Sequence, residues 1–270
     1  AGAANSAAAH VVTKTANAKG MVATVVTAPL ATTLSNYYDF LGNLSRVDSP
    51  GAGGGTLSKT MRYDVRGRQT RLSDPDAGTY NYTYNGVGEQ VSQSDGTFTT
   101  TTTYDSLGRK KTRTESPGSI QTTWTYDCSN ALGLLCSVSY GGAGGSASVS
   151  TTKTTVYDKY ARPTTTTTDI GGAKFVSQLA YDAAGRPMYA VYPQATTATA
   201  PLAIRTRYST LGFAYQTENA ATQFIYQQIK ARGADGQLLQ ANLGTLLTLN
   251  HGYSGDGLGR IARVNVSNGV

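Results

Sequence analysis

The chain has 270 residues, a formal net charge of +7 and 39% hydrophobic residues. It contains two histidines, two cysteines and only three glutamates, and no phosphate loop, paired-carboxylate site or metal-ligand cluster stands in the sequence. No apolar run approaches the roughly 18 residues that suggest a membrane-spanning helix. This composition argues against an enzyme, a cofactor-binding protein and a membrane span.

One six-residue pattern, Tyr-Asp-x-x-Gly-Arg, recurs along the chain. It is complete at Tyr63, Tyr104 and Tyr181, where 63–68, 104–109 and 181–186 match every position. Copies altered at one or two positions begin at Tyr38, Tyr84 and Tyr157, and residues 231–237 form a decayed copy. A recurring period indicates an array of small units.

The pattern predicts a β-hairpin with a tight turn. Asp bonds its side chain to a following backbone N–H, and Gly three residues later supplies the positive φ that closes the turn. Tyr ends the incoming strand, and we expect tyrosines of successive repeats to stack as a ladder with their hydroxyls near water. Arg is expected to pair with a carboxylate or to lie over a Tyr face.

The segments between the motifs are rich in Thr, Val and aromatic residues, which favour strands. Runs such as 99–103 and 164–168 are polar on both faces, so they suit a repeat array better than a compact sandwich, which needs an apolar face on each sheet. Weak helical periodicity occurs only at 220–231, where a strand pair is an equal alternative. We therefore expect an all-β fold of tandem hairpins, with divergent repeat or lead-in strands at 1–35 and an array of about ten units at 36–270.

The residues expected to build the repeats are those of the motif positions. They are Tyr38, Asp39, Gly42, Tyr63, Asp64, Gly67, Arg68, Tyr84, Gly88, Tyr104, Asp105, Gly108, Arg109, Tyr126, Asp127, Tyr157, Asp158, Arg162, Tyr181, Asp182, Gly185, Arg186, Tyr208, Gly212, Tyr253, Gly259 and Arg260.

The two cysteines, Cys128 and Cys136, flank a longer turn after Tyr126-Asp127. Opposed across a hairpin base they could reach disulfide distance. Two free thiols are the alternative of similar weight, and a metal site has the least support because no histidine or second cysteine pair is near. The redox compartment stays open.

The remaining charged and titratable residues give no strong functional signal. The basic cluster 109–113 is interpreted as a solvated strand edge rather than a nucleic-acid patch. His10 and His251 are expected at the surface or in turns. Residues 1–9 lack the features of a signal peptide, and we expect the chain to be an interior piece of a longer protein.

The motif residues resemble those of the RHS repeat, also called the YD repeat, over roughly residues 36–270. The turn at 74–80 is similar to the common inter-repeat turn of that family, and 128–136 resembles a longer loop of bacterial members. The resemblance implies long strands that spiral into a hollow shell, or cocoon. In bacterial Rhs toxins and the B/C components of Tc complexes such a shell holds a C-terminal toxin, which aspartyl autoproteolysis releases, whereas in animal teneurins it serves adhesion.

The family's autoproteolysis segment is absent from this chain, and Asp74-Pro75 lies early, where it is expected to be a turn. Our first hypothesis is thus a non-catalytic part of a shell that encloses a toxin, with no cofactor. Its partners would be the rest of the shell, the cargo, and secretion or receptor-binding components, but no nucleic acid. It would act in a secreted bacterial complex, with assembly in the cytoplasm before export as one route. The alternative is an extracellular module whose Tyr-rich surface binds a carbohydrate or protein receptor.

Overall fold

The computed structural model describes residues 11–29, 32–142, 150–193, 200–255 and 259–268, so His10 lies outside the described residues. Within these ranges the regular structure consists of 22 β-strands and one short 3-10 helix, η1 (Ala52–Gly54). No helix in the described part of the chain is long and apolar enough to cross a membrane. The expected all-β fold is confirmed.

The contacts divide the chain into two compact units. Unit 1 comprises residues 1–122 and 142–147, and unit 2 comprises 123–141 and 148–270. The strands of unit 1 are β1 (Val11–Ala16), β2 (Val22–Ala28), β3 (Thr32–Tyr38), β4 (Leu44–Pro50), β5 (Thr56–Tyr63), β6 (Gln69–Asp74), β7 (Gly78–Tyr84), β8 (Gln90–Ser94), β9 (Thr99–Tyr104) and β10 (Lys110–Ser116). β11 (Ile120–Tyr126) contains the boundary between the units.

Unit 2 continues with the same kind of element. Its strands are β12 (Leu135–Gly142), β13 (Thr151–Tyr157), β14 (Pro163–Ile170), β15 (Ala173–Tyr181), β16 (Pro187–Val191), β17 (Ala203–Tyr208), β18 (Ala214–Asn219), β19 (Ile225–Arg232), β20 (Leu238–Leu243), β21 (Leu247–Tyr253) and β22 (Ile261–Asn268).

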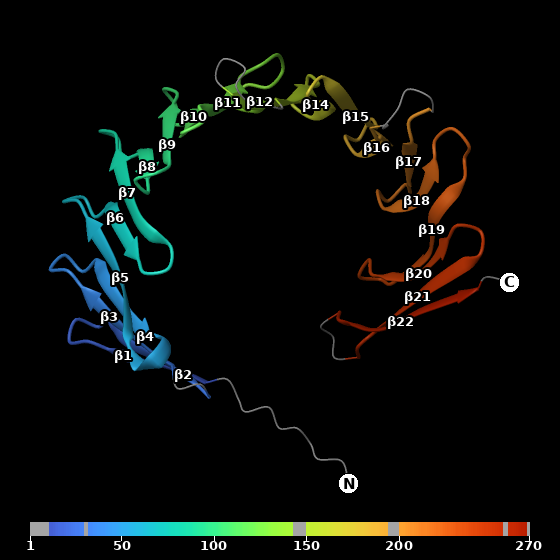
Figure 1. Cartoon of the computed structure of the whole chain (residues 1–270). Coiled ribbons are helices and arrows are strands. Elements are labelled where there is room, and N and C mark those ends of the chain that lie inside the picture. Colours follow the sequence, from blue (N-terminus) through green and yellow to red (C-terminus); the bar gives the residue numbers. More distant parts are fainter. Residues whose placement is uncertain (1–10, 30–31, 143–149, 194–199, 256–258, 269–270) are drawn as a thin grey trace, which may run out of the picture. The chain divides into compact units, whose positions relative to one another are not determined.

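Each unit is an antiparallel meander in which strands that follow one another in sequence also pair. This holds from β1 to β10 and from β12 to β22. The turns therefore alternate between the two ends of the strands. Each row of turns is called an edge here, and the term does not refer to the outermost strands. In unit 1 the motif turns form one edge, which lies at the left of Figure 1 in blue to green, and the remaining turns form the opposite edge.

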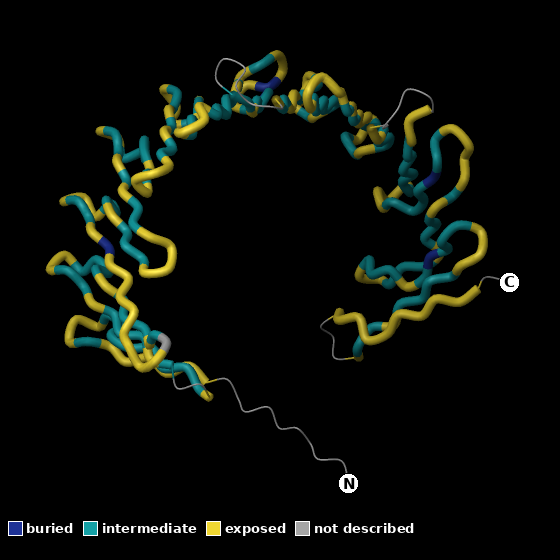
Figure 2. Tube along the Cα trace, viewed as in Figure 1, coloured by how far each residue is buried: buried dark blue, intermediate teal, exposed yellow. Residues whose placement is uncertain are grey.

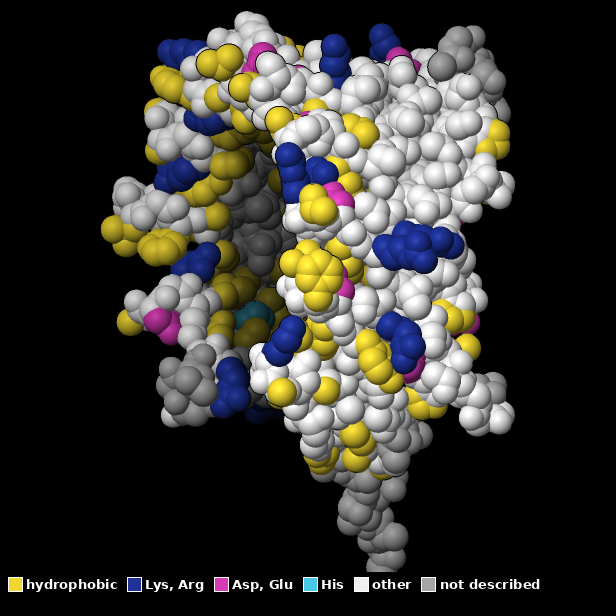
Figure 3. All heavy atoms as spheres, turned by 90° about the vertical axis from the view of Figure 1, so that its left-hand side faces the viewer, with side chains coloured by type: hydrophobic (Ala, Val, Ile, Leu, Met, Phe, Trp, Pro, Cys, Tyr) yellow, Lys and Arg dark blue, Asp and Glu magenta, His cyan; other side chains and the backbone are white. Residues whose placement is uncertain are grey.

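Very little of the chain is buried. Among the described residues, the buried apolar side chains are those of Met61, Ala131, Cys136 and Ala241, and Glu218 is the one buried charged residue. Figure 2 accordingly shows intermediate and exposed colours almost throughout, and much of the surface in Figure 3 is white, the colour of the backbone and of side chains that are neither hydrophobic nor charged. Strand pairing and contacts between neighbouring hairpins must therefore supply most of the stability, because a large hydrophobic core is absent from the described part.

The faces of the sheets differ along the chain. β9 and β14 carry the Thr runs that the sequence indicated, and both faces of these strands are polar. The C-terminal strands depart from this expectation: Ile229, Ala241, Leu249 and Val266 are successive register partners on one face of β19–β22. The polarity of both faces is thus a property of the Thr-rich strands and does not extend to the last four.

Two uncertain segments of the sequence are strands and turns in the structure. Residues 220–231, where helical periodicity was weak, form a turn and most of β19, so they contain one strand rather than a helix or a strand pair. Near the N-terminus, the backbone N–H groups of Asn17 and Gly20 bond to the carbonyls of Met21 and Asn17, as in the motif turns. The described part of 1–35 therefore contains a repeat turn without Tyr or Arg.

Candidate functional site

The motif turn is a closed hydrogen-bonded unit, and Asp64 illustrates it. With the motif tyrosine as position 1, the position 2 N–H bonds to the position 6 carbonyl, and the position 5 N–H bonds to the position 2 carbonyl. The Asp64 Oδ1 atom accepts the backbone N–H of Arg66 at 2.9 Å and of Arg68 at 3.0 Å. The carboxylate thus satisfies two donors that the turn leaves free of backbone partners.

The same pair of backbone hydrogen bonds recurs along both units. The position 5 residue always has positive φ, between 60° and 102°, which explains the preference for Gly. The second residues of these turns are Asn17, Asp39, Asp64, Asn85, Asp105, Asp158, Asp182, Ser209 and Gly233.

The position 6 arginine makes two contacts at once. Arg186 Nε donates to Asp182 Oδ2 of its own turn at 2.7 Å, and the guanidinium carbon lies 4.3 Å from the ring centroid of Tyr208 in the next repeat. Arg68 has the same two partners, Asp64 and Tyr84, and Arg162 pairs with Asp158 and covers Tyr181. Carboxylate pairing and ring stacking, which the sequence offered as alternatives, occur together and link one repeat to the next.

The position 1 tyrosine returns a hydrogen bond to the preceding repeat. Its hydroxyl donates to a backbone carbonyl oxygen at 2.7–2.9 Å; the acceptor is position 7, the first residue after the motif, except for Leu135, which is the first residue after the longer loop of the cysteine repeat. The donors are Tyr38, Tyr63, Tyr84, Tyr104, Tyr157, Tyr181, Tyr208 and Tyr253, and their acceptors are Val22, Leu44, Gln69, Gln90, Leu135, Pro163, Pro187 and Leu238. We name this contact, with the arginine over the ring where it is present, the inter-repeat latch.

The latch gives the tyrosine hydroxyls a partner that the sequence did not indicate. Each of these eight hydroxyls is bonded to a backbone carbonyl, and the bonds of Tyr157, Tyr181 and Tyr208 are also exposed to solvent. Burial raises the pKa of Tyr63 and of Tyr104, with the nearby carboxylates Asp39 and Glu89 as the next cause. The motif tyrosine is therefore a hydrogen-bond donor to the neighbouring hairpin as well as a packing ring.

The position 2 carboxylates are held in the ionised form. The pKa of Asp64 lies below its ordinary value because of the Arg68 backbone N–H and then the Arg68 side chain, and the same holds for Asp105 with Arg109. For Asp182 the side-chain hydrogen bond from Arg186 is the largest cause of the lowered pKa. These carboxylates have structural partners, so their chemistry is that of a turn and not of an acid–base site.

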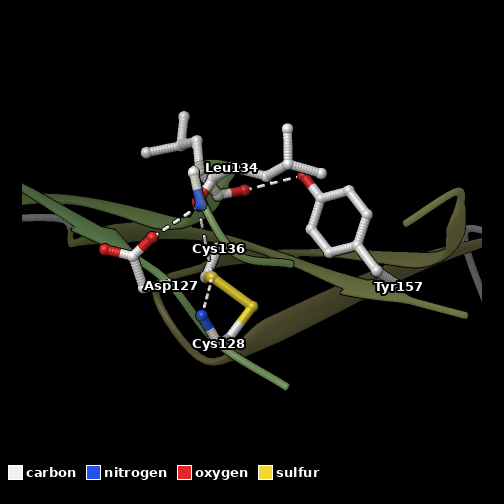
Figure 4. Close-up of a disulfide and its surroundings, with 7 residues drawn as sticks. Asp127, Cys128, Leu134, Cys136 and Tyr157 are labelled. Carbon is white, nitrogen blue, oxygen red and sulfur yellow. Dashed lines mark hydrogen bonds between the residues drawn. A yellow bond between two sulfur atoms is a disulfide. The ribbon is translucent and has the colours of Figure 1, made fainter. Parts of the chain in front are cut away.

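The repeat that contains the two cysteines uses a different closure. Cys128 and Cys136 form a disulfide with Cα atoms 5.9 Å apart, at the base of the longer loop (Figure 4). Asp127 Oδ1 accepts the Gly133 N–H at 2.6 Å, and Tyr157 bonds to the Leu135 carbonyl at 2.7 Å, so the latch to the next repeat is kept.

The histidine His251 and the turn that follows Tyr253 lie near the C-terminal end of unit 2. His251 lies within β21, half-buried, with its ring edge-on to Tyr253, so its expected position at the surface or in a turn is wrong. The Tyr253 turn closes through the Ser254 N–H and the Arg260 carbonyl, and Gly259 has φ +65°.

No group of three His, Cys, Asp or Glu side chains in the described ranges could hold a metal ion.

One charged cluster was not found from the sequence. Glu218, 2% exposed, accepts hydrogen bonds from Arg207 at 2.9 Å and Gln216 at 2.6 Å, and Arg205 lies 3.7 Å away. These interactions, led by that of Arg207, lower the pKa of Glu218. The residues come from the paired strands β17 and β18, and only the cross-strand register, which the motif does not specify, could have indicated the cluster.

Solved structures share this arrangement of hairpins. The Photorhabdus luminescens Tc holotoxin pore with the mutation TccC3-D651A aligns with 94% of this chain at 13% identity and a TM-score of 0.51. TcdB2-TccC3 aligns with 92% and TcdB2-TccC3-Cdc42 with 96%, each at 13% identity and a TM-score of 0.52. The likeness confirms the tandem-hairpin fold that the resemblance to RHS repeats implied.

The chain spans only 15–16% of the length of these Tc toxin chains. No protein-family profile matches the chain, and no curated protein does. The comparisons thus define a fold class, that of the repeat array of Tc toxin chains, in which the latch residues are the candidate functional residues.

Proposed function

We propose that this chain is a non-catalytic structural segment of an RHS-repeat shell that encloses a C-terminal toxin or effector before delivery. The observation that carries the proposal is the inter-repeat latch. A wall only one sheet thick cannot rely on a second layer for stability, so each hairpin must be fixed to the next by contacts along the sheet. Eight tyrosine hydroxyls do this by bonding to a backbone carbonyl of the preceding repeat, and at Tyr84, Tyr181 and Tyr208 an arginine of that repeat also covers the ring.

The surface chemistry of the strands also suits a container. Both faces of β9 and β14 bear Thr hydroxyls, so either face offers a cargo hydrogen bonds with no large apolar patch. Such a wall would exclude solvent and proteases while holding an unfolded cargo weakly, which allows release when the shell opens.

The proposal also assigns parts of the chain to repeats and names the partners of the segment. We assign residues 36–270 to the repeat array and 1–35 to a divergent N-terminal repeat, which the turn at Asn17 supports. The partners would be neighbouring repeats of the same shell, the enclosed cargo, and secretion or receptor-binding components of a secreted bacterial complex. The likeness to Tc toxin chains supports this setting, and the wall itself would perform no reaction.

A display module for carbohydrate or receptor binding ranks second. It requires rows of free aromatic faces, on which sugars stack. The rings of Tyr84, Tyr181 and Tyr208 each lie under an arginine, so one face of each ring is already occupied. This arrangement favours the container.

Electron cryomicroscopy of the full-length gene product that contains this chain tests the proposal. The container predicts a closed β-shell with weak, disordered density inside, and protease resistance of the C-terminal cargo until the shell is opened. An open array with no enclosed volume, or a cargo domain cleaved as fast with the array as without it, would overturn the proposal. In that case a glycan and receptor screen would examine the display module.

A further inference from the structure

The two edges of unit 1 carry different side chains at their turn tips. On the motif edge, positions 3 and 4 of the five turns hold mainly apolar and basic side chains, with Gly86 and Ser106 as the exceptions: Ala18 and Lys19, Phe40 and Leu41, Val65 and Arg66, Gly86 and Val87, and Ser106 and Leu107. The turns of the opposite edge that lie between β4 and β9 hold Gly, Pro, Ala, Thr, the carboxylates of Asp76 and Asp95, and one exposed aromatic residue, Phe98. The sheet is therefore polarised from one edge to the other.

The apolar tips of the motif edge project into solvent. Phe40 is 86% exposed, Val65 94%, Val87 83% and Leu107 73%. The turns are closed by backbone hydrogen bonds and the position 2 side chain, so these side chains do nothing for the turn itself. One motif turn occurs every two strands, which spaces the tips about 10 Å apart along the edge.

The charges beside these tips are mainly positive. Lys19, Arg66, Lys110 and Lys111 are on or next to the motif turns, and none of the four forms an ion pair with a described carboxylate. Asp64 and Asp105 are neutralised by the arginines of their own turns, whereas Asp39 and Glu89 accept hydrogen bonds from the amides of Asn43 and Asn85 and keep their charge. Figure 3 looks onto this side of unit 1, and hydrophobic and basic side chains follow one another down its central ridge, with a few acidic side chains between them.

We propose that the motif edge of unit 1 is a docking surface for an anionic phospholipid bilayer. Separate apolar tips do not make the contiguous patch of about 800 Å² per partner that a stable protein interface buries. A bilayer interface can instead receive each side chain singly, because Phe, Leu and Val enter the acyl boundary while neighbouring Lys and Arg remain at the headgroups. Anionic headgroups complement the excess of basic groups, and the acidic opposite edge fixes which side faces the membrane.

Co-sedimentation of the whole chain with lipid vesicles tests this surface. We expect binding to vesicles of equal parts phosphatidylcholine and phosphatidylserine, weak binding to phosphatidylcholine alone, and loss of binding in high salt. The double variant Phe40→Ser, Leu41→Ser should weaken partitioning at least about tenfold, because two inserted side chains are lost. Lys19→Gln with Lys111→Gln should weaken binding to the anionic vesicles only.

The matched control is Phe98→Ser, which removes an exposed aromatic residue from the opposite edge and should bind as the unaltered chain does. Thermal melting of each variant separates lost binding from lost fold. The proposal is overturned if the unaltered chain does not sediment with anionic vesicles, or if the Phe40 and Phe98 variants bind equally. A change of oligomeric state on replacing Phe40 and Leu41, measured by light scattering without lipid, would also overturn it and assign the edge to contact between copies.

Discussion

Arg232 stands where other repeats have the motif tyrosine, and its guanidinium carbon lies 5.5 Å from the ring centroid of Phe213 in the preceding repeat. Its Nη2 atom donates to the Ala214 carbonyl oxygen at 3.1 Å. Ala214 is position 7, the acceptor that receives a tyrosine hydroxyl elsewhere, and Phe213 is position 6, where elsewhere the arginine stands. The ring and the cation have exchanged places across the latch, and the cation–π contact and the hydrogen bond are both kept.

This exchange indicates that the repeats are defined by the cation–π contact and the hydrogen bond across the latch more than by which residue type stands at each position. A guanidinium and a phenol can each donate to the same carbonyl, and a cation–π pair is equivalent whichever strand carries the ring. A sequence pattern that requires Tyr at position 1 misses such a unit, although its turn at Gly233–Gln237 has the same backbone bonds as the others.

The latch hydroxyl should contribute measurably to stability. Replacing Tyr84 by Phe keeps the ring under Arg68 but removes the donor to the Gln69 carbonyl, 2.7 Å away. We expect a loss of about 1 kcal/mol in the free energy of unfolding, since one part-buried hydrogen bond is lost. Urea unfolding followed by circular dichroism would measure it.

Tyr160→Phe is the control for that measurement. Tyr160 projects from a turn tip, and its ring contacts Lys159 and Arg162, which phenylalanine preserves. Its unfolding midpoint should match that of the unaltered chain. Equal midpoints for the Tyr84 and Tyr160 variants would mean that the hydroxyl bond adds nothing to the ring contact.

The position 5 glycines should resist β-branched replacements. Gly67, Gly108 and Gly185 have φ of +77°, +77° and +82°, and valine in each should cost about 1–3 kcal/mol, because side chains there strain the backbone. Gly86→Ala is the control, since Gly86 lies in a motif turn outside the left-handed region and nothing lies within 4 Å of an added Cβ. Melting temperatures unchanged in all three valine variants would refute the turn assignment.

The turns and their period could be predicted from sequence because the Asp and Gly requirements are local. The steps from Tyr63 to Tyr84 and from Tyr84 to Tyr104 state the hairpin length directly. The latch could not be derived in full, since its acceptor is a backbone carbonyl on the adjacent strand of the preceding repeat, and any residue supplies one, Pro163 and Pro187 included. The apolar face of β19–β22 was missed for a related reason: it depends on register across four strands, which one-residue bulges shift.

Lowering the pH should reduce the free energy of unfolding, because carboxylates that are ionised in the folded state become protonated. The hydrogen bond from the Lys59 side chain, followed by the backbone N–H groups of Asp76 and Ala77, lowers the pKa of Asp74 from 3.8 to about 2. A carboxyl whose pKa is lower in the folded state stabilises the fold above its unfolded pKa and loses that contribution as pH falls through its folded pKa. The urea midpoint should therefore drop between about pH 4 and pH 2, as protons bind the unfolded chain first.

The Asp74→Asn variant should be less stable than the unaltered chain at neutral pH. Its urea midpoint should fall less than that of the unaltered chain between about pH 4 and pH 2. Asp76→Asn, in the same turn but outside the Lys59 pair, is the matched variant, and its midpoint should follow the unaltered chain. If the acid profiles of the two variants coincide, Lys59 does not act through Asp74.

The repeat at Tyr84 offers a test of the position 2 and position 6 pair. Here Asn85 Nδ2 donates to Glu89 Oε2 at 2.6 Å. An amide and a carboxylate thus replace the usual Asp and Arg, and the donor is the position 2 residue instead of the position 6 residue. Asn85→Asp restores the common motif residue yet sets two carboxylates against each other. We expect it to lower the free energy of unfolding by about 1–2 kcal/mol at neutral pH, because a hydrogen bond is lost and like charges meet.

Adding Glu89→Arg to Asn85→Asp should recover that loss. The pair would then match Asp64 and Arg68, whose Oδ2 and Nε atoms are 2.7 Å apart, and the new arginine would approach Tyr104 as Arg68 approaches Tyr84. A double-mutant cycle should give a favourable coupling of about 1–3 kcal/mol that shrinks in high salt. Asp64→Asn, made alone, should destabilise its own turn, because Arg68 then lies against a neutral amide. If Asn85→Asp is neutral alone, or if adding Glu89→Arg does not rescue it, the position 6 residue is not matched to position 2, and the ion pairs of the other turns are incidental to the array.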